Sequence, residues 1–327
     1  MNRGWLAWMA GVLALAGAGA GAPALRAQVP DAVVAITDPV VLPAGAKGRR
    51  LLVRVSAPAH IRGRAPVILF SHGAALNRDR YAPLVEAWAR AGYVVLAPDH
   101  EDGVIDGFPP PPPSAQLWRT RIGDLRRLAH ALPAVEAQVP ALRGHLDARK
   151  LLVAGHSFGG HTASALVGAR VRDADTGKGI DLAEPLIRGA VLLSPPGAGK
   201  PEDLVPSFGK RGGFLDVDWA HLRGPVLVIV GSEDDSAALT VRGPAWHADI
   251  YRKSAAKGMC LLTLTGGRHY LGGIVDPRRT GMEDADPARL ALVRRASLAL
   301  FADALAGRAP AAVQFQPLGT PGDVECR

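Results

Sequence analysis

Short apolar runs alternate along the chain with longer segments in which apolar residues recur every three or four positions. Each run is four or five residues long, as is typical of strands buried on both faces of a sheet. The runs are 67–70, 94–97, 151–154, 190–193, 226–230 and 261–264. The helical spacing covers 77–91, 119–132, 158–169 and 287–306. This alternation predicts an α/β fold with a mostly parallel central sheet and helices on both faces.

Two earlier segments, 33–42 and 50–55, are predicted strands separated by the Pro- and Gly-containing turn 43–48. We expect them to form an antiparallel start to the sheet, and 261–264 to be its last strand. The carboxyl ends of parallel strands meet at one edge of a sheet, so the catalytic residues are expected in the loops there.

The first 27 residues have the composition of a targeting segment. Arg3 precedes the apolar run 5–18, and small residues follow it, as in a secretory signal peptide. The run is too short to span a bilayer comfortably, although an uncleaved membrane anchor is the alternative. Ala24 and Ala27 both end suitable cleavage sites, and we favour Ala27. Residues 28–327 would then form a single catalytic domain, secreted or periplasmic.

The chain has two cysteines, Cys260 and Cys326. In an exported protein two cysteines suggest one disulfide bond. Such a bond would tie the C-terminal tail to the predicted strand 261–264. The alternative is two free thiols, because sequence alone does not establish that the two residues are close.

The formal net charge of +8 falls to about 8 − 2 = +6 without the leader, which carries Arg3 and Arg26 and no acids. The basic residues are scattered or paired. The pairs are Arg49-Arg50, Arg126-Arg127 and Arg278-Arg279. Without a dense basic tract and interleaved aromatic residues, a nucleic-acid partner is not expected. Beyond the leader the sequence has no second apolar stretch of spanning length, so no stable membrane span is expected either.

Two segments interrupt the alternation of strands and helices. Pro109–Pro113 is a run of five prolines, which predicts a stiff polyproline II spacer within a loop. Residues 195–223 are rich in Gly, Pro and charge and follow the end of a predicted strand. They are either a small lid over the site or an ordinary long connection.

The run Gly155-His156-Ser157-Phe158-Gly159-Gly160 directly follows the predicted strand 151–154 and opens a predicted helix. This matches the G-x-S-x-G elbow, in which glycines let backbone segments approach closely and the serine is presented at the top of the sheet. We expect Ser157 to be a nucleophile and the N–H of Phe158 to face a developing oxyanion. The alternative is a tight turn with an inert serine.

A serine nucleophile needs a base and an orienting acid, which follow in the chain order Ser, acid, His. His269 follows the run 261–264 and is the predicted base. The acid lies among Glu233, Asp234 and Asp235 after the run 226–230. Asp234 is preferred, and the other two are expected to be solvated or capping groups.

The second oxyanion donor is expected in the loop after 67–70, where we choose the N–H of Ala74. His72, His100 and His156 are expected to have structural roles. No His, Cys, Asp or Glu cluster has metal-ligand spacing and no Gly-rich phosphate cradle is present, so neither a metal nor a cofactor is expected.

Residues 67–73, 92–100 and 155–160 together resemble the platelet-activating-factor acetylhydrolase and dienelactone-hydrolase-like group of the α/β-hydrolase superfamily. Bacterial cutinase-like polyester hydrolases are similar. The resemblance implies hydrolysis of carboxylic esters through an acyl-enzyme, and it supports the amides of Ala74 and Phe158 as the oxyanion hole.

The chain departs from parts of this group. Animal acetylhydrolases carry the acid after the strand that ends here at Leu193-Ser194, where Ser194 and Pro195 cannot serve. The acid is therefore expected after the next strand, as in cutinases and dienelactone hydrolases. Dienelactone hydrolase proper uses a cysteine nucleophile where this chain has Ser157. A disulfide bond near the C-terminus would also be cutinase-like.

Together these features predict an exported serine carboxylic-ester hydrolase with a small-molecule or polymeric ester substrate. Two alternatives remain: an amidase or peptidase of the same fold, and a non-catalytic binding protein on the same scaffold, because a fold does not fix a function.

Overall fold

The computed structural model describes residues 32–45, 48–104, 116–173, 176–209, 212–276, 284–312 and 322–327. The expected signal peptide (residues 1–27) and the five-proline run (109–113) lie outside the described residues. Within the described ranges, no helix is both long and apolar enough to cross a membrane.

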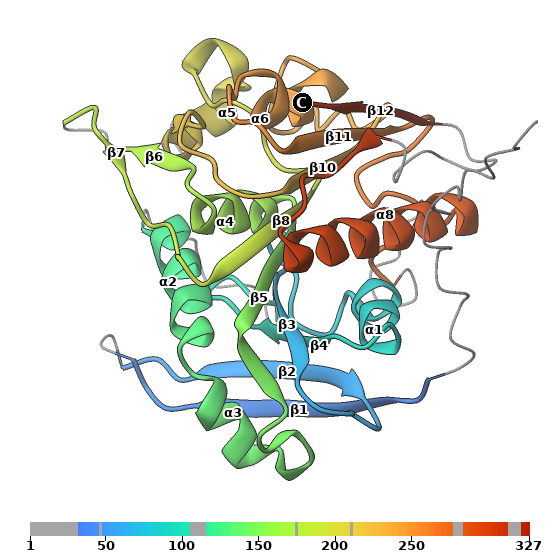
Figure 1. Ribbon diagram of the computed structural model, residues 1–327. Helices are drawn as coiled ribbons and strands as arrows, with labels where there is room; N and C mark the ends of the chain where they lie inside the picture. The colour runs from blue at the N-terminus through green and yellow to red at the C-terminus, as the bar shows by residue number, and fades with distance from the viewer. Residues whose placement is uncertain are drawn as a thin grey trace, which may run out of the picture. The chain divides into compact units, whose positions relative to one another are not determined.

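A nine-stranded sheet in the order β1-β2-β4-β3-β5-β8-β10-β11-β12 forms the centre of the fold (Figure 1). The strands are β1 (Val34–Leu42), β2 (Leu51–Pro58), β3 (Ala65–Ser71), β4 (Val94–Pro98), β5 (Leu146–His156), β8 (Ile187–Leu193), β10 (Val226–Gly231), β11 (Met259–Leu264) and β12 (Gly322–Cys326). Neighbouring strands from β4 through β11 are parallel. The antiparallel pairs β1·β2 and β2·β4 begin the sheet, as predicted.

The expectation that 261–264 is the last strand is wrong. β12 pairs antiparallel with β11 and places Cys326 opposite Cys260, and a disulfide bond joins these two residues. Only five residues long, polar at alternate positions and next to the C-terminus, β12 has no long apolar run that would mark it as a strand.

Helices cover both faces of the sheet (Figure 1). They are α1 (Ala82–Arg90), α2 (Leu117–Ala129), α3 (Leu132–Gln138), α4 (Phe158–Leu166) and α8 (Pro287–Ala306), with the short α5 (Pro206–Gly209) and α6 (Asp249–Arg252). α2, α3 and α4 pack on the face to which Val67 and Leu69 point. α1 and α8 pack on the opposite face with Ile68 and Phe70. The apolar runs are continuous because both faces are buried, so the predicted α/β fold is confirmed.

Helix ends follow local chemistry. α8 has the predicted bounds: the Asp286 carboxylate accepts hydrogen bonds from the amides of Ala288 and Arg289, and Gly307 ends the helix at φ 67°. α1 begins at Ala82 and not at residue 77, because the preceding residues bond elsewhere: the Arg78 amide donates to Asp99. The predicted helix 119–132 ends at Ala129, and α3 starts afresh with Pro133 in its first turn.

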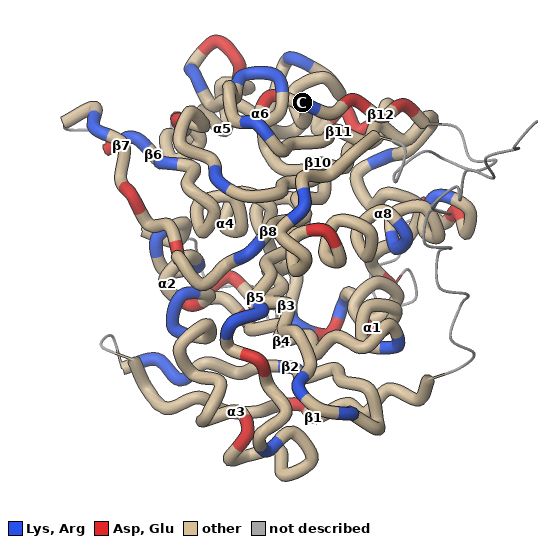
Figure 2. Tube along the Cα trace, in the orientation of Figure 1, with Lys and Arg blue, Asp and Glu red and all other residues tan. Residues whose placement is uncertain are grey.

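A small second sheet, in the order β7-β6-β9, was not predicted. Its strands are β6 (Arg170–Arg172), β7 (Gly179–Ile180) and β9 (Val217–Asp218), two or three residues each. They are too short to give a periodic pattern in the sequence. β9 belongs to the segment 195–223 and pairs with β6, so this sheet holds the end of that segment close to the region after α4. Figure 2 shows basic and acidic residues interspersed along the described elements, as the scattered basic pairs of the sequence suggest.

Candidate active site

Ser157 lies at the sharp turn between β5 and α4. Its backbone has φ 54° and ψ −122°, a strained conformation for a residue with a side chain, and its amide donates to the carbonyl of Leu193 at 2.8 Å. The flanking glycines, Gly155 and Gly159, are required because a side chain at either position would collide with the backbone. A β-carbon on Gly155 would lie 2.1 Å from the oxygen of Gly159, and one on Gly159 would lie 2.0 Å from the oxygen of Ser71. The geometry of the turn is that of a nucleophile elbow.

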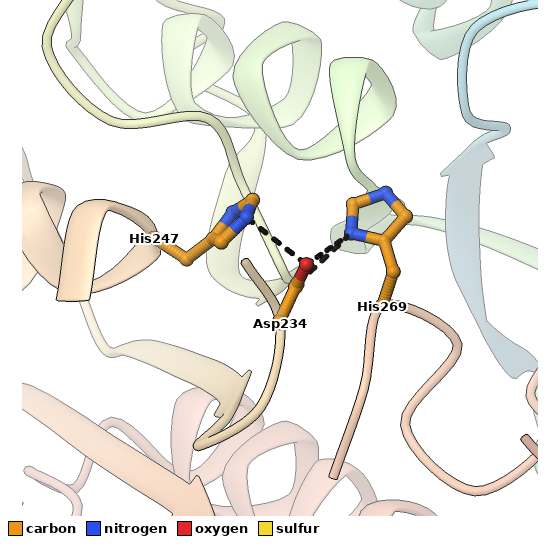
Figure 3. A group of neighbouring side chains, drawn as sticks. All are labelled: Asp234, His247 and His269. Atoms are coloured by element: carbon orange, nitrogen blue, oxygen red, sulfur yellow. Dashed lines mark hydrogen bonds and ion pairs between the residues drawn. The ribbon is translucent and has the colours of Figure 1, made fainter. Parts of the chain in front are cut away.

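Asp234 and His269 approach each other from the ends of β10 and β11 (Figure 3). His269 Nδ1 donates to Asp234 Oδ2 at 2.9 Å and lies 3.0 Å from Oδ1. The two turns that carry them are packed together, because a β-carbon on Gly231 would lie 2.1 Å from the oxygen of Gly267. With its proton on Nδ1, His269 has Nε2 as its basic nitrogen.

The other two candidate acids are turned away from His269. Glu233 is exposed and lies 3.6 Å from the guanidinium of Arg268. Asp235 accepts a hydrogen bond from the amide of Ala237 at 3.4 Å, as a local turn-capping group does. Asp234 is 2% exposed. Burial by itself raises the pKa of Asp234, but hydrogen bonds from His247 and His269 outweigh burial and hold it far below its usual range, so the group is a carboxylate.

His247 is a neighbour of Asp234 that no sequence pattern indicated. It lies on the 3₁₀ helix η4 (Pro244–Ala248), and its Nε2 is 3.2 Å from Asp234 Oδ1, on the side opposite His269 (Figure 3). No motif surrounds this histidine, so only the tertiary fold identifies it. Among the described residues Asp234, His247 and His269 form a group whose ligand-type atoms all lie within 4.8 Å of one another. The facing nitrogens of both imidazoles are already hydrogen-bonded to the carboxylate, which accounts for the spacing.

Ala74 lies in the exposed loop after β3, next to the elbow. The contact of Gly159 with the oxygen of Ser71 brings this loop beside the start of α4, where Phe158 is the first helical residue. Within the described residues, no backbone hydrogen bond uses the N–H of Ala74. The next residue, Ala75, has φ 54°, and its amide donates to Asp102 at 3.3 Å.

A fully buried arginine, also missed from sequence, supports this loop. Arg121 Nη1 donates to both carboxylate oxygens of Asp102, at 2.6 and 2.8 Å, and Nη2 donates to the carbonyl of His72. The same guanidinium stacks over the ring of Phe158 at 4.6 Å. One side chain therefore contacts the segments that carry both expected oxyanion donors. The helical pattern around Arg121 did not indicate that this residue is buried, because arginine is rarely buried in a helix.

His156 links the loop after β3 to the loop that carries His269. The Gly73 amide donates to the hydroxyl of Tyr81 at 2.8 Å, and that hydroxyl donates to His156 Nδ1 at 2.8 Å. His156 Nε2 then donates to the backbone carbonyl of His269 at 2.8 Å. Burial lowers the pKa of His156 to about 3, which keeps the ring neutral as this chain of bonds requires. The structural role expected of His156 agrees with these contacts.

His72 and His100 also make structural contacts. His100 Nδ1 donates to Asp124 at 3.0 Å, and its Nε2 accepts from the hydroxyl of Ser71 at 2.9 Å. The His100 amide donates to His72 Nε2 at 3.1 Å. Burial lowers the pKa of both histidines well below the usual value, so they pack as neutral groups beneath the loop.

The segment 195–223 lies against the start of α4. Phe214 stacks near Phe158 with ring centroids 4.9 Å apart, and its carbonyl accepts from His161 Nε2 at 3.1 Å. The segment contains the 3₁₀ helices η2 (Pro201–Asp203) and η3 (Gly212–Leu215), and Leu204 and Leu215 form a small core with Trp246. Its position next to the elbow is compatible with a lid, and the choice between a lid and an ordinary long connection stays a prediction.

Comparison with known proteins finds one family model and solved structures that are similar to this chain. A family model described as Chlorophyllase matches residues 43–175, which include Ala74 and the elbow at Ser157 but not Asp234 or His269. No curated protein matches the sequence. Among solved structures, a proposed dienelactone hydrolase from Klebsiella pneumoniae subsp. pneumoniae aligns with a TM-score of 0.51 at 14% identity, covering 83% of this chain and 99% of that chain. The predicted resemblance is confirmed at the level of the fold: the chain has the α/β-hydrolase fold.

Proposed function

We propose that the chain is a serine carboxylic-ester hydrolase with Ser157 as nucleophile, His269 as base and Asp234 as the orienting acid. The observation that carries the proposal is the hydrogen bond from His269 Nδ1 to the buried, ionised Asp234. An acid held in this way fixes the tautomer of the base and stabilises the imidazolium that forms during attack. The strained backbone of Ser157 supports the same assignment.

In the proposed mechanism, Ser157 Oγ attacks the ester carbonyl as His269 Nε2 takes the hydroxyl proton. The amides of Ala74 and Phe158 donate to the oxyanion, and the N-terminus of α4 adds positive potential there. His269 then gives the proton to the leaving alkoxide, which leaves an acyl group on Ser157. A water molecule, activated by the same imidazole, hydrolyses this acyl-enzyme and restores the serine. The reaction needs no cofactor.

Export is part of the proposal. The composition of residues 1–27 and the bond between Cys260 and Cys326 support a secreted or periplasmic protein. N-terminal sequencing of the protein recovered from outside the cytoplasm should begin at Gln28. A mature protein that retains Met1 would contradict cleavage after Ala27.

The direct test is turnover of p-nitrophenyl acetate by the purified protein and its variants. Ser157→Ala should abolish turnover while the circular dichroism spectrum is unchanged. Asp234→Asn should lower kcat by about 10⁴-fold, as loss of the orienting acid does in serine hydrolases. The matched control, Asp235→Asn, changes an exposed neighbour and should leave kcat within about twofold. Full turnover by Ser157→Ala would reject the proposal.

Two alternative functions can be distinguished with the same purified protein. An amidase or peptidase of this fold would cleave p-nitroanilides in preference to the matching esters, and a non-catalytic binding protein would cleave neither. A panel of esters of increasing acyl length, with a polyester film, identifies the substrate class. Chlorophyll belongs in the panel because the matched family model is described as Chlorophyllase.

A further inference from the structure

The carboxylate of Asp234 lies between two imidazoles, and the proposed triad uses only one of them. The second, His247, has a side chain that is 1% exposed. Its Nδ1 lies 2.8 Å from the carbonyl oxygen of Pro195. Its Nε2 lies 3.2 Å from Asp234 Oδ1 and 2.9 Å from the hydroxyl oxygen of Ser236.

The partners of His247 determine where its protons are. A carbonyl oxygen only accepts hydrogen bonds, so Nδ1 must carry a proton toward Pro195. The Ser236 hydroxyl lies 3.2 Å from Asp234 Oδ1 and 2.9 Å from His247 Nε2, and its single proton can be donated to only one of them. In a neutral His247 the lone pair of Nε2 would face the carboxylate oxygen in either case, so its contacts with Asp234 and Ser236 could not both be hydrogen bonds. A proton on Nε2 turns both contacts into hydrogen bonds, and it gives the buried carboxylate a charged partner.

We infer that His247 is held as an imidazolium and is a positioning residue that sets the pH range in which His269 acts as a base. The inference rests on the proposed function. A carboxylate alone would favour the charged form of His269. The positive charge of His247 opposes this, because the two rings have centroids only 5.5 Å apart. The charge of His247 therefore favours the neutral form of His269, which is the form that accepts the Ser157 proton.

The other titratable groups near His269 leave this role to His247. His156, with its ring centroid 4.7 Å from that of His269, is neutral because burial lowers its pKa to about 3. Tyr270 is neutral because burial raises its pKa. Three charged groups lie on the same loop or next to it. They are Arg268 and Glu233, which are paired with each other and exposed, and Asp284, which accepts from the Tyr270 amide at 3.1 Å.

The position of the His247 ring is fixed by its own segment. Trp246 Nε1 donates to the carbonyl of Ala198 at 2.8 Å, and the Ala198 amide donates to Asp249 at 3.0 Å. Together with the bond to Pro195, these contacts join η4 and α6 to the start of the segment 195–223. In the folded protein the ring is therefore already held in place against Asp234, as a positioning residue requires.

The experiment compares the pH dependence of kcat/KM on p-nitrophenyl acetate for the unsubstituted protein and His247→Gln. The glutamine amide can still donate to Asp234 but carries no charge. The acid limb of the profile should move to higher pH by about one unit or more, with the plateau at high pH changed less than tenfold. The control, His221→Gln, removes an exposed histidine and should leave the profile unchanged. An unmoved acid limb in His247→Gln would overturn the inference.

Nitrogen NMR of the unsubstituted protein with labelled histidine provides a second readout that does not depend on activity. At pH 7 both ring nitrogens of His247 should carry protons, and a neutral His247 ring would overturn the inference even if His247→Gln fails to fold. The two failures are distinguishable. Turnover by Ser157→Ala would reject the proposed function, whereas a neutral His247 in a protein that Ser157→Ala inactivates would reject only the role of His247.

Discussion

Gly159 lies directly against the carbonyl oxygen of Ser71, so close that a β-carbon on Gly159 would be 2.0 Å from it. This contact joins the elbow that carries Ser157 to the loop that carries Ala74. The two proposed oxyanion donors come from parts of the chain more than 80 positions apart. Their relative position depends on a backbone approach that only glycine permits.

Gly159→Ala is therefore expected to be damaging. The added methyl group meets backbone atoms that cannot turn away, so the free energy of unfolding should fall by about 2 kcal/mol or more, and esterase activity should be lost. Urea denaturation measures the change. The matched control is Gly123→Ala on α2, where the new β-carbon would meet nothing within 4 Å. It should be neutral or stabilising by up to about 1 kcal/mol. Equal behaviour of the two variants would contradict this account of the elbow.

Arg121→Lys tests whether Arg121 holds the loop after β3, which carries the proposed oxyanion donor Ala74. Lysine keeps the charge, but it cannot donate to both oxygens of Asp102 and to the carbonyl of His72 at the same time. We expect kcat to fall about 10- to 100-fold with KM little changed, because a small displacement of the donors weakens transition-state binding. Steady-state kinetics on a soluble ester provides the measurement.

The control for Arg121 is Arg126→Lys on the same helix. Arg126 is 44% exposed and lies 3.8 Å from Glu184. The Arg126→Lys variant should retain the kinetic constants of the unsubstituted protein. If Arg121→Lys also retains them, the guanidinium does not position the loop.

The sequence predicted those parts of the molecule that depend on local pattern. Strands that are buried on both faces of the sheet give continuous apolar runs, so the central strands were identified. α8 was identified from its helical spacing of apolar residues. The elbow at Ser157 was identified because its glycines, strand and helix are contiguous in the chain. His269 was predicted as the base because a glycine turn follows a buried strand, and the chain order of the α/β-hydrolase fold indicated which histidine to choose.

The features that were missed depend on contacts between distant segments. β12 is a strand only because β11 offers it an edge and a disulfide partner. Arg121 and His247 sit on helical segments without a motif, and their importance comes from Asp102 and Asp234, which lie 19 and 13 positions away in the chain. The structure places Asp234, and not Glu233 or Asp235, against His269. The sequence could not distinguish the three, because adjacent acids differ only in the direction their side chains take.

The free energy of unfolding at low pH is expected to depend on the buried histidines. Burial lowers the pKa of His161 to about 4, and its Nε2 donates to the carbonyl of Phe214. Below the ordinary pKa of about 6.5 the unfolded chain binds a proton that the folded protein does not. Stability therefore falls as pH decreases from about 6.5 towards 4, by roughly 2 to 3 kcal/mol for this one group at pH 4.5.

His161→Gln removes this titration. The difference in the free energy of unfolding between pH 7.5 and pH 4.5 should shrink by roughly 2 kcal/mol relative to the unsubstituted protein. Urea denaturation at the two pH values measures it. An unchanged difference would show that His161 takes up its proton equally in the folded and unfolded states.

The disulfide bond should stabilise the edge of the sheet at β11 and β12. Cys260 and Cys326 are 66 residues apart, and closing a loop of that length corresponds to roughly 4 kcal/mol in the chain-entropy treatment. Reduction under native conditions should lower Tm, and the double variant Cys260→Ala, Cys326→Ala should have the lower Tm with or without reductant. Insensitivity of the unsubstituted protein to reductant would contradict a stabilising role.

Covalent labelling measures whether Ser157 is an activated nucleophile. A fluorophosphonate probe reacts with a serine that has an active base, and mass spectrometry of the digested protein locates the adduct. We expect one adduct, on Ser157, and its loss in His269→Ala although the serine is still present. An adduct on another serine, or no adduct on the folded protein, would show that Ser157 is not the activated nucleophile.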